Sequence, residues 1–264
     1  MTYDKIYLRE GHPDVFLETY IAEPVGAKKR KAILVIPGGG YGGVCADREG
    51  EPIAMAFMPY GYNGFVLHYT VGRKEPYPAQ LREVTLAIKH IKDNAENYNI
   101  NPDEVFTVGF SAGGHLSATI GTQWKHPAVY EAMDMPYGYN KPKGTMLIYP
   151  VIDNHDFSFH FLLCNDHPTE EQLDQVRLSK HVDADTCPTF IMHTSNDQEV
   201  NIQNSLNFAQ ALGKAGHKFE MHIYPDAPHG IALGNDITEC AFPGWRNGAI
   251  AEWVRLAAKW AETL

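Results

Sequence analysis

One serine in this sequence lies where a nucleophile would have to be held. Ser111 belongs to the segment GFSAGG at residues 109–114, which follows the apolar run 105–108 and precedes the helix-compatible residues HLSATI. A GxSxG pattern between a strand and a helix forms a sharp turn that holds the serine hydroxyl out at the strand end. Gly109 and Gly113 are expected where a Cβ atom would strike the neighbouring strand or helix. The pattern predicts a serine nucleophile.

A glycine-rich segment supplies candidate donors for the negative charge that develops when a serine attacks a carbonyl. Residues 37–43 read PGGGYGG and follow directly on an apolar run. Successive glycines can turn backbone amides inward without obstruction by side chains. We expect Gly39 and Gly40 to donate from this segment, and Ala112 to donate from the start of the helix after Ser111. The alternatives are a flexible surface loop or a phosphate-binding loop, although the GK[ST] ending and GxGxxG spacing of the latter are absent.

Two further residues complete a proton relay in the chain order serine, acid, histidine. Asp197 lies just past the apolar run 189–193, and His229 lies just past the run that ends at Tyr224. Both residues are therefore expected at the same end of a parallel sheet as Ser111. His229 would accept the serine proton and return it to the leaving group, while Asp197 would fix the imidazole tautomer.

The acid of this relay has a rival. Asp153 follows the preceding apolar run in the segment YPVID, and Asp197 has the alternative role of an N-terminal acid for a helix expected near Asn201. Its position after the penultimate strand favours Asp197. The chain has 13 histidines but no HExxH or comparable ligand pair, so we expect neither a metal nor a cofactor.

The elements that must position these residues follow from the hydrophobic pattern. From residue 31 onward, short apolar runs alternate with amphipathic segments, as in a parallel sheet covered by helices on both faces. Two alternating stretches, 5–8 and 15–22, predict an antiparallel hairpin at the sheet edge. The fold class is α/β, with a mostly parallel, doubly wound sheet. The remaining strands are expected at residues 32–36, 64–67, 105–108, 146–149, 189–193 and 219–224.

Three segments have the period of amphipathic helices, and one region interrupts the alternation. The helical stripes are Leu81, Val84, Ile88 and Ile91; then Ile202, Leu206, Ala209 and Leu212; then Ile250, Trp253 or Val254, Ala257 and Trp260. Residues 153–185, after the sixth strand, are polar, with one short helical stretch around 170–178. We interpret them as a small cap-like insertion over the strand ends, within one domain that spans 1–264.

The net charge and the cysteine pattern indicate which partners and which cellular compartment to expect. The 22 basic and 32 acidic residues give a net charge of −10, which disfavours nucleic acids and anionic membranes as partners. Neither a bilayer-spanning segment nor a secretory leader is visible. The four cysteines, Cys45, Cys164, Cys187 and Cys240, have no CxxC spacing. We expect a cytoplasmic protein that acts on a small molecule; the sequence does not specify its oligomeric state.

The combined order of motifs resembles a known family. The segments PGGGY, YPAQLREV, GFSAGGHLSA, YPVID, HTSNDQEV and PDAPHG resemble the esterases related to acetylxylan and feruloyl esterases, near the hormone-sensitive-lipase-like branch. This resemblance implies an α/β-hydrolase fold, a triad of Ser111, Asp197 and His229, and hydrolysis of short acyl esters, including those of acetylated xylo-oligosaccharides, without a cofactor. Pro37 stands where the lipase branch has the histidine of its HGGG motif, which argues against a lipase.

Two other functions are compatible with this fold and set of motifs. An amide-cleaving relative, such as an arylformamidase or a peptidase-like domain, would use the same triad. A non-catalytic binding protein of this fold would be expected to lack a triad residue, and none is missing.

We expect Tyr41, Tyr69 and Tyr77 to line the substrate pocket together with the insertion 153–185. The insertion is rich in Asp, His, Asn and Thr, which suits a hydroxylated alcohol such as a sugar.

Overall fold

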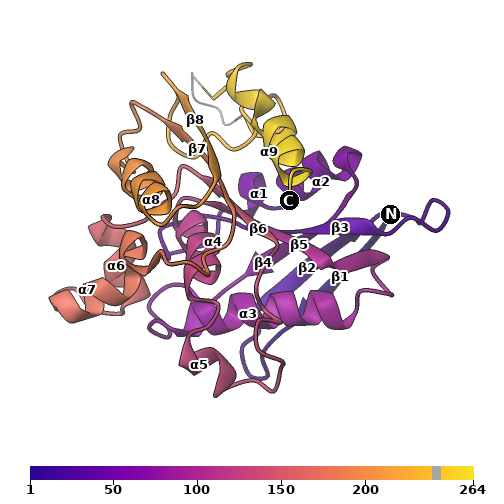
Figure 1. Cartoon of the computed structure of the whole chain (residues 1–264), viewed down its shortest axis with the longest axis horizontal. Coiled ribbons are helices and arrows are strands. Elements are labelled where there is room, and N and C mark those ends of the chain that lie inside the picture. Colours follow the sequence, from indigo (N-terminus) through magenta and orange to yellow (C-terminus); the bar gives the residue numbers. More distant parts are fainter. Residues whose placement is uncertain (240–244) are drawn as a thin grey trace.

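A central sheet organises the chain. The computed structural model describes residues 1–239 and 245–264, so Cys240 lies outside the described residues. Within them, an eight-stranded sheet has the order β1-β2-β4-β3-β5-β6-β7-β8 (Figure 1). β1 (Thr2–Tyr7) and β2 (Phe16–Ile21) form an antiparallel hairpin at one edge, and β2 also pairs antiparallel with β4. The remaining pairs are parallel, which confirms the predicted fold class and the edge hairpin.

The six other strands all lie where the apolar runs predict them. The side chains of residues 32–36 in the first of them are all 0% exposed, because helices cover both faces of the sheet. The last strand lies at the opposite edge and is only partly buried. These strands are β3 (Arg30–Ile36), β4 (Tyr62–His68), β5 (Ile100–Phe110), β6 (Gly144–Ile148), β7 (Thr189–Thr194) and β8 (Phe219–Tyr224).

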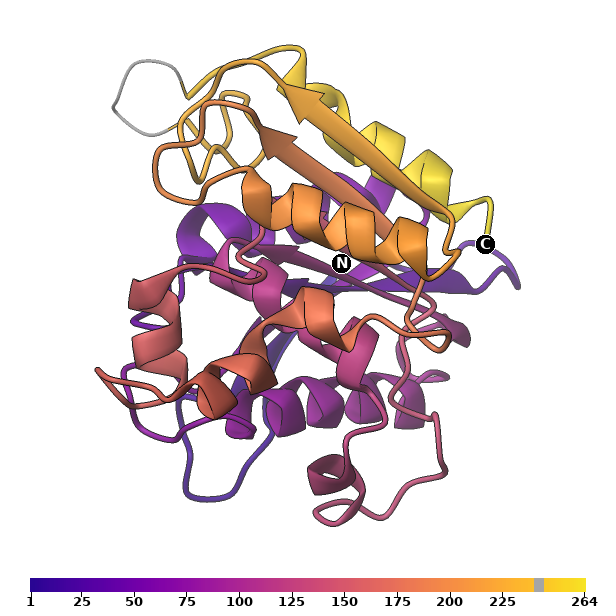
Figure 2. The ribbon, with the colours of Figure 1, turned by 60° about the vertical axis from the view of Figure 1, so that its left-hand side comes forward.

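Helices cover both faces of this sheet. α2 (Glu51–Phe57) and α9 (Trp253–Ala261) share one core cluster, in which Phe57 packs edge-on against Trp253. α3 (Ala79–Asp93) and α4 (Ala112–Gln123) contribute to the cluster on the other face. Figures 1 and 2 show α8 (Gln203–Lys214) and α9 on opposite sides of β7 and β8. No helix in the described part of the chain is long and apolar enough to cross a membrane.

Two of the three helical stripes are confirmed, and one is partly wrong. The stripe of α3 and that of α9 with the short 3-10 turn Ile250–Glu252 before it are buried, and each large apolar side chain contributes about 1.5–3 kcal/mol when buried. In α8, however, Leu206 is 38% exposed, while Phe208 is buried. Asn204 and Ser205 take the inner face because Asn204 accepts the buried amide of Ile152 after β6 and Ser205 hydrogen-bonds to the buried His193 in β7. An apolar stripe could not reveal this polar anchoring.

The insertion after β6 contains more helix than expected. The predicted helix corresponds to α7 (Glu170–Val176), which is followed by a 3-10 turn at Leu178–His181. A further helix, α6 (Asp156–Leu162), was not predicted. Its buried Phe159 and Leu162 face the core, and Phe157 is 54% exposed. The expectation of a polar cover is therefore wrong for α6, which presents an aromatic side chain. Shorter helices elsewhere are α1 (Ala46–Glu49) and α5 (Pro127–Tyr130), with a 3-10 turn at Met58–Tyr60.

Candidate active site

Ser111 lies on a strained turn between β5 and α4. Its backbone has φ 52° and ψ −116°, a conformation that a residue other than glycine adopts at a cost of about 1–3 kcal/mol. A Cβ atom at Gly109 would lie 2.1 Å from the Gly113 carbonyl oxygen, and one at Gly113 would lie 2.0 Å from that of Ile36. Both glycines are required for the close approach of backbone to backbone, as the sequence predicts. The turn holds the Ser111 side chain at the carboxyl end of the central strand.

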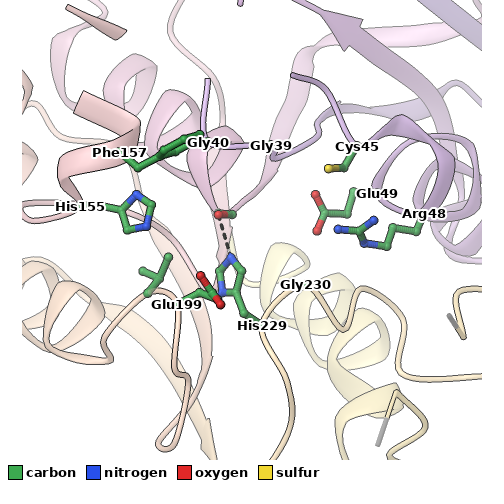
Figure 3. Close-up of a pocket in the computed structure, with 12 residues that line it drawn as sticks. Gly39, Gly40, Cys45, Arg48, Glu49, His155, Phe157, Glu199, His229 and Gly230 are labelled. Carbon is green, nitrogen blue, oxygen red and sulfur yellow. Dashed lines mark hydrogen bonds between the residues drawn. The ribbon is translucent and has the colours of Figure 1, made fainter. Parts of the chain in front are cut away.

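A chain of hydrogen bonds joins Ser111 to the predicted histidine and acid. His229 Nε2 lies 2.8 Å from Ser111 Oγ (dashed line in Figure 3). His229 Nδ1 lies 2.7 Å from Asp197 Oδ2. Asp197 Oδ2 accepts the Nδ1 proton, so the neutral imidazole presents Nε2 as an acceptor for the serine hydroxyl. This arrangement can remove a proton from Ser111 as its oxygen attacks a carbonyl.

The surroundings of Asp197 keep its carboxyl group ionised. Its Oδ1 accepts the backbone amides of Glu199 and Val200, each at 2.9 Å. Burial raises the pKa of Asp197, but hydrogen bonds from His193 and His229 outweigh burial and hold that pKa well below its usual value. The sequence analysis missed the role of His193 in lowering the pKa of Asp197. The Nε2 atom of His193 lies 3.4 Å from Asp197 Oδ2. A histidine inside an apolar strand gives no signal of such a contact.

The rival acid has different partners. Asp153 Oδ1 accepts the amide of Ser179 at 3.0 Å, and its Oδ2 accepts the side-chain amide of Asn207 at 3.2 Å. These bonds tie the insertion to α8. The structure thus brings His229 to Asp197, and it uses Asp153 to hold a loop.

The three candidate oxyanion donors surround Ser111. Gly39 (φ 128°) and Gly40 (φ 63°) line the same cleft as Ser111, and a Cβ atom at Gly39 would lie 2.3 Å from the Gly43 carbonyl oxygen. Across residues 1–239 and 245–264, neither glycine amide donates a hydrogen bond to the protein. Ala112 begins α4, where an amide has no acceptor within the helix. All three amides are therefore available to a ligand.

The three tyrosines expected as pocket walls are buried in the core, so that prediction is wrong. Tyr41 and Tyr69 are 1% exposed and Tyr77 is 9% exposed, and none lines the cleft. Their hydroxyl groups find partners inside the protein, which is how a long amphipathic side chain is accommodated in a core. The contacts are Tyr41 Oη with His115 Nδ1 at 2.8 Å, Tyr69 Oη with the Pro37 carbonyl oxygen at 2.7 Å, and Tyr77 Oη with Gln123 Oε1.

The cleft in front of Ser111 has a volume of about 190 Å³ and two unlike sides. His155 and Phe157, from the insertion, lie on one side, and Cys45, Arg48 and Glu49, from α1 and the residue before it, lie on the other (Figure 3). The sequence predicts the insertion 153–185 at the pocket without singling out His155 or Phe157, and it gives no indication that Cys45, Arg48 and Glu49 lie there, because none of the five belongs to a recognisable motif.

Comparison with known proteins agrees with this fold. The arrangement of sheet and helices is the α/β-hydrolase fold. An acetyl ester-xyloside bifunctional hydrolase from Caldicellulosiruptor lactoaceticus is 31% identical and superposes with a TM-score of 0.83 over 98% of this chain and 96% of its own. The BD-FAE family matches residues 17–212, and the chain belongs to this family. The resemblance inferred from the sequence motifs is confirmed.

Curated relatives are longer proteins. The chain is 34% identical over 244 residues to endo-1,4-beta-xylanase B of Butyrivibrio fibrisolvens, a match that covers 88% of this chain and 37% of the relative. It is 28% identical over 212 residues to an acetylxylan esterase of Xylanibacter ruminicola, with coverage of 77% and 42%. The chain therefore spans about two fifths of the length of these relatives.

Proposed function

We propose that this protein hydrolyses carboxylic esters through an acyl-enzyme at Ser111. The observation that carries the proposal is the hydrogen-bonded chain from Ser111 Oγ to His229 at 2.8 Å and from His229 to Asp197 at 2.7 Å. Ser111 Oγ attacks the ester carbonyl carbon while His229 Nε2 takes the hydroxyl proton. Asp197 stabilises the imidazolium that forms.

The negative charge on the carbonyl oxygen is held by backbone amides. Gly39, Gly40 and Ala112 would donate to this oxygen, and one such donor is typically worth about 3–4 kcal/mol. As the tetrahedral intermediate collapses, the bond to the alcohol breaks and His229 returns the proton to the leaving oxygen. Water then attacks the acyl-enzyme, with His229 again as the base, and the carboxylic acid leaves. No cofactor takes part in these steps.

We propose that the acyl group is short and that the alcohol carries hydroxyl groups, as in acetylated xylo-oligosaccharides. A cleft of about 190 Å³ has little room for a long acyl chain. The exposed ring of Phe157 offers an apolar surface for a sugar ring, and Glu199 and Arg48 also line the cleft. The relatives named for acetylxylan and acetyl-xyloside hydrolysis support the same substrate class.

His155 adds a polar group to this wall. Its Nδ1 accepts the Ser158 amide at 3.3 Å, which leaves a hydrogen on Nε2 of the neutral ring. Burial and the nearby His229 lower the pKa of His155, so the neutral form prevails at pH 7. A hydrogen-bond donor beside the Phe157 ring suits a hydroxylated alcohol.

A hydrolysis panel tests both levels of the proposal. It runs from acetyl to octanoyl p-nitrophenyl esters and includes acetylated xylo-oligosaccharides, feruloyl esters and N-formylkynurenine, with Ser111→Ala as the blank. We expect the highest kcat/KM for acetyl to butyryl esters, a steep fall beyond hexanoyl, and release of acetate from the oligosaccharides. A preference for octanoyl esters contradicts the substrate class, and a preference for N-formylkynurenine favours an amide-cleaving enzyme. A Ser111→Ala variant that keeps the wild-type activity contradicts the mechanism.

A further inference from the structure

A buried carboxyl group lies behind the glycine loop, outside the proton relay. Glu49 ends α1 and is 2% exposed. Its Oε2 accepts the Gly38 amide at 2.8 Å, and its Oε1 accepts the Tyr149 hydroxyl at 2.9 Å. Burial of a carboxylate is costly unless its oxygen atoms are satisfied by hydrogen bonds. Glu49 meets this requirement with one donor from each of two segments that flank the active site.

The partner on the first segment is the residue just before the candidate oxyanion donors. A Cβ atom at Gly38 would lie 2.8 Å from the Phe110 carbonyl oxygen, 2.9 Å from Glu49 Oε2 and 3.0 Å from Ser111 Cβ. Gly38 is thus wedged between the nucleophile turn and Glu49. Gly39 and Gly40 follow directly, so the bond from the Gly38 amide to Glu49 anchors the start of the segment that carries their amides.

The partner on the other side reaches the loop that carries His229. Tyr149 follows β6 with φ 38°, a strained conformation for a tyrosine, and its ring lies 5.0 Å from the His229 ring in an edge-on arrangement. Its Oη accepts the Ala232 amide at 3.0 Å while it donates to Glu49. Strain of this kind persists where the surroundings hold a residue in place. Tyr149 thus connects Glu49 to the base and to the segment after it.

A cation is close by but does not take these bonds. Arg48 lies beside Glu49, yet within the described residues its ion pair is with Asp47 at 3.8 Å, and its guanidinium packs over the Trp245 ring at 5.5 Å. Burial raises the pKa of Glu49, and the Gly38 amide, Arg48 and Tyr149 lower it to a smaller extent. The direct hydrogen bonds of the carboxyl group therefore go to Gly38 of the glycine loop and to Tyr149 after β6.

We propose that Glu49 is a positioning residue for ester hydrolysis, which ties the loop of Gly39 and Gly40 to the loop of His229 through Gly38 and Tyr149. It does not touch the substrate. It fixes the distance between the amides that bind the oxyanion and the imidazole that moves the proton. This inference rests on the proposed function, because it assigns Glu49 a part in the same reaction.

Three variants measured with p-nitrophenyl acetate test the proposal. Glu49→Ala leaves the Gly38 amide and the Tyr149 hydroxyl without an acceptor, and we expect kcat to fall about a hundredfold while KM changes by less than about threefold. Glu49→Gln keeps an acceptor for Gly38, and we expect it to remain within about tenfold of the wild-type kcat. Asp47→Ala, which removes an exposed acid from the same helix, is the matched control and should behave as wild type.

A tetrahedral inhibitor separates positioning from loss of folded protein. Butylboronic acid adds to a serine Oγ and places an oxygen where the oxyanion forms, so its Ki should rise by the same factor as kcat/KM falls in Glu49→Ala. Titration of Ser111 with a fluorophosphonate counts the folded sites. If Ki stays at the wild-type value while kcat/KM falls, or if Glu49→Gln loses as much as Glu49→Ala, the proposal is overturned.

Tyr149→Phe decides the matter if Glu49→Ala does not fold. This variant removes one hydroxyl group from the Glu49 connection, and we expect kcat to fall about tenfold with a parallel rise in the Ki of butylboronic acid. Wild-type kcat and Ki in folded Tyr149→Phe would overturn the proposal. A wild-type protein that fails to hydrolyse the ester panel contradicts the proposed function itself. An active wild-type protein with unaffected Glu49 and Tyr149 variants contradicts only the role proposed for Glu49.

Discussion

The nucleophile turn and the α6 wall face the same cleft but are built from different kinds of contact. At the turn, Cβ atoms on Gly109 and Gly113 would approach backbone oxygens to within 2.1 and 2.0 Å. At the wall, Phe157 is 54% exposed, and its ring centroid lies 4.7 Å from that of Phe161. Backbone cannot yield to a new side chain, whereas an exposed ring can turn aside. The turn therefore constrains the sequence tightly, and the wall leaves it free to vary with the substrate.

The largest effect is expected at the turn itself. Ser111→Ala should lower kcat/KM for p-nitrophenyl acetate by about a millionfold, because it removes the nucleophile and leaves the base with no proton to take. The thermal midpoint should stay close to that of the wild type, since one hydroxyl group is lost. A fluorophosphonate should label the wild type at Ser111, as mass spectrometry would show. A variant that keeps more than about one percent of the wild-type rate would contradict the assignment.

The acid gives the next largest effect, with its rival as the matched control. Asp197→Asn should lower kcat by about ten-thousandfold, because an amide at this position favours the wrong tautomer of His229. Asp153→Asn should change kcat by less than about tenfold, because Asp153 bonds to Ser179 and Asn207 and not to the base. Steady-state kinetics on the two purified variants compares them directly. The reverse ranking would place the acid after β6.

The pH dependence of the free energy of unfolding tests whether the Asp197 carboxyl group is ionised in the folded protein. The pKa of Asp197 is lower in the folded protein than in an unfolded chain, so its ionisation adds stability above the unfolded value of about 3.9. This contribution is lost as the pH falls below that value. Urea unfolding at pH 7, 5 and 3 should therefore show a wild-type advantage over Asp197→Asn that shrinks with acidity. An advantage that stays constant over this range would mean that the folded carboxyl group has an ordinary pKa.

The features that the sequence could predict are those that the backbone constrains, and the features that it could not predict depend on side-chain contacts. The strands and the glycines of the turn were predicted because continuous apolar runs and steric exclusion of Cβ atoms leave few alternatives. Tyr41 and Tyr69 were assigned to the pocket wrongly, because a tyrosine near a loop can satisfy its hydroxyl group either in water or inside the core. Glu49 carried no signal, because a buried carboxyl group in a short helix has the same sequence appearance as a solvated one. Contacts made through side chains of distant segments require the structure.

The smallest expected effect lies at the wall, where Phe157→Ala removes an exposed ring. We expect KM for acetylated xylo-oligosaccharides to rise about fivefold, which corresponds to about 1 kcal/mol of ring contact, while kcat/KM for p-nitrophenyl acetate stays within about twofold. Phe219→Ala is the matched control, because Phe219 is 37% exposed on the edge strand β8 and does not line the cleft. Equal losses for both substrates would mean that Phe157 supports the glycine loop, since a Cβ atom at Gly40 would lie 2.6 Å from its ring. An unchanged KM for the oligosaccharides would remove Phe157 from the alcohol site and shift that role to the opposite side of the cleft, where Arg48 lies.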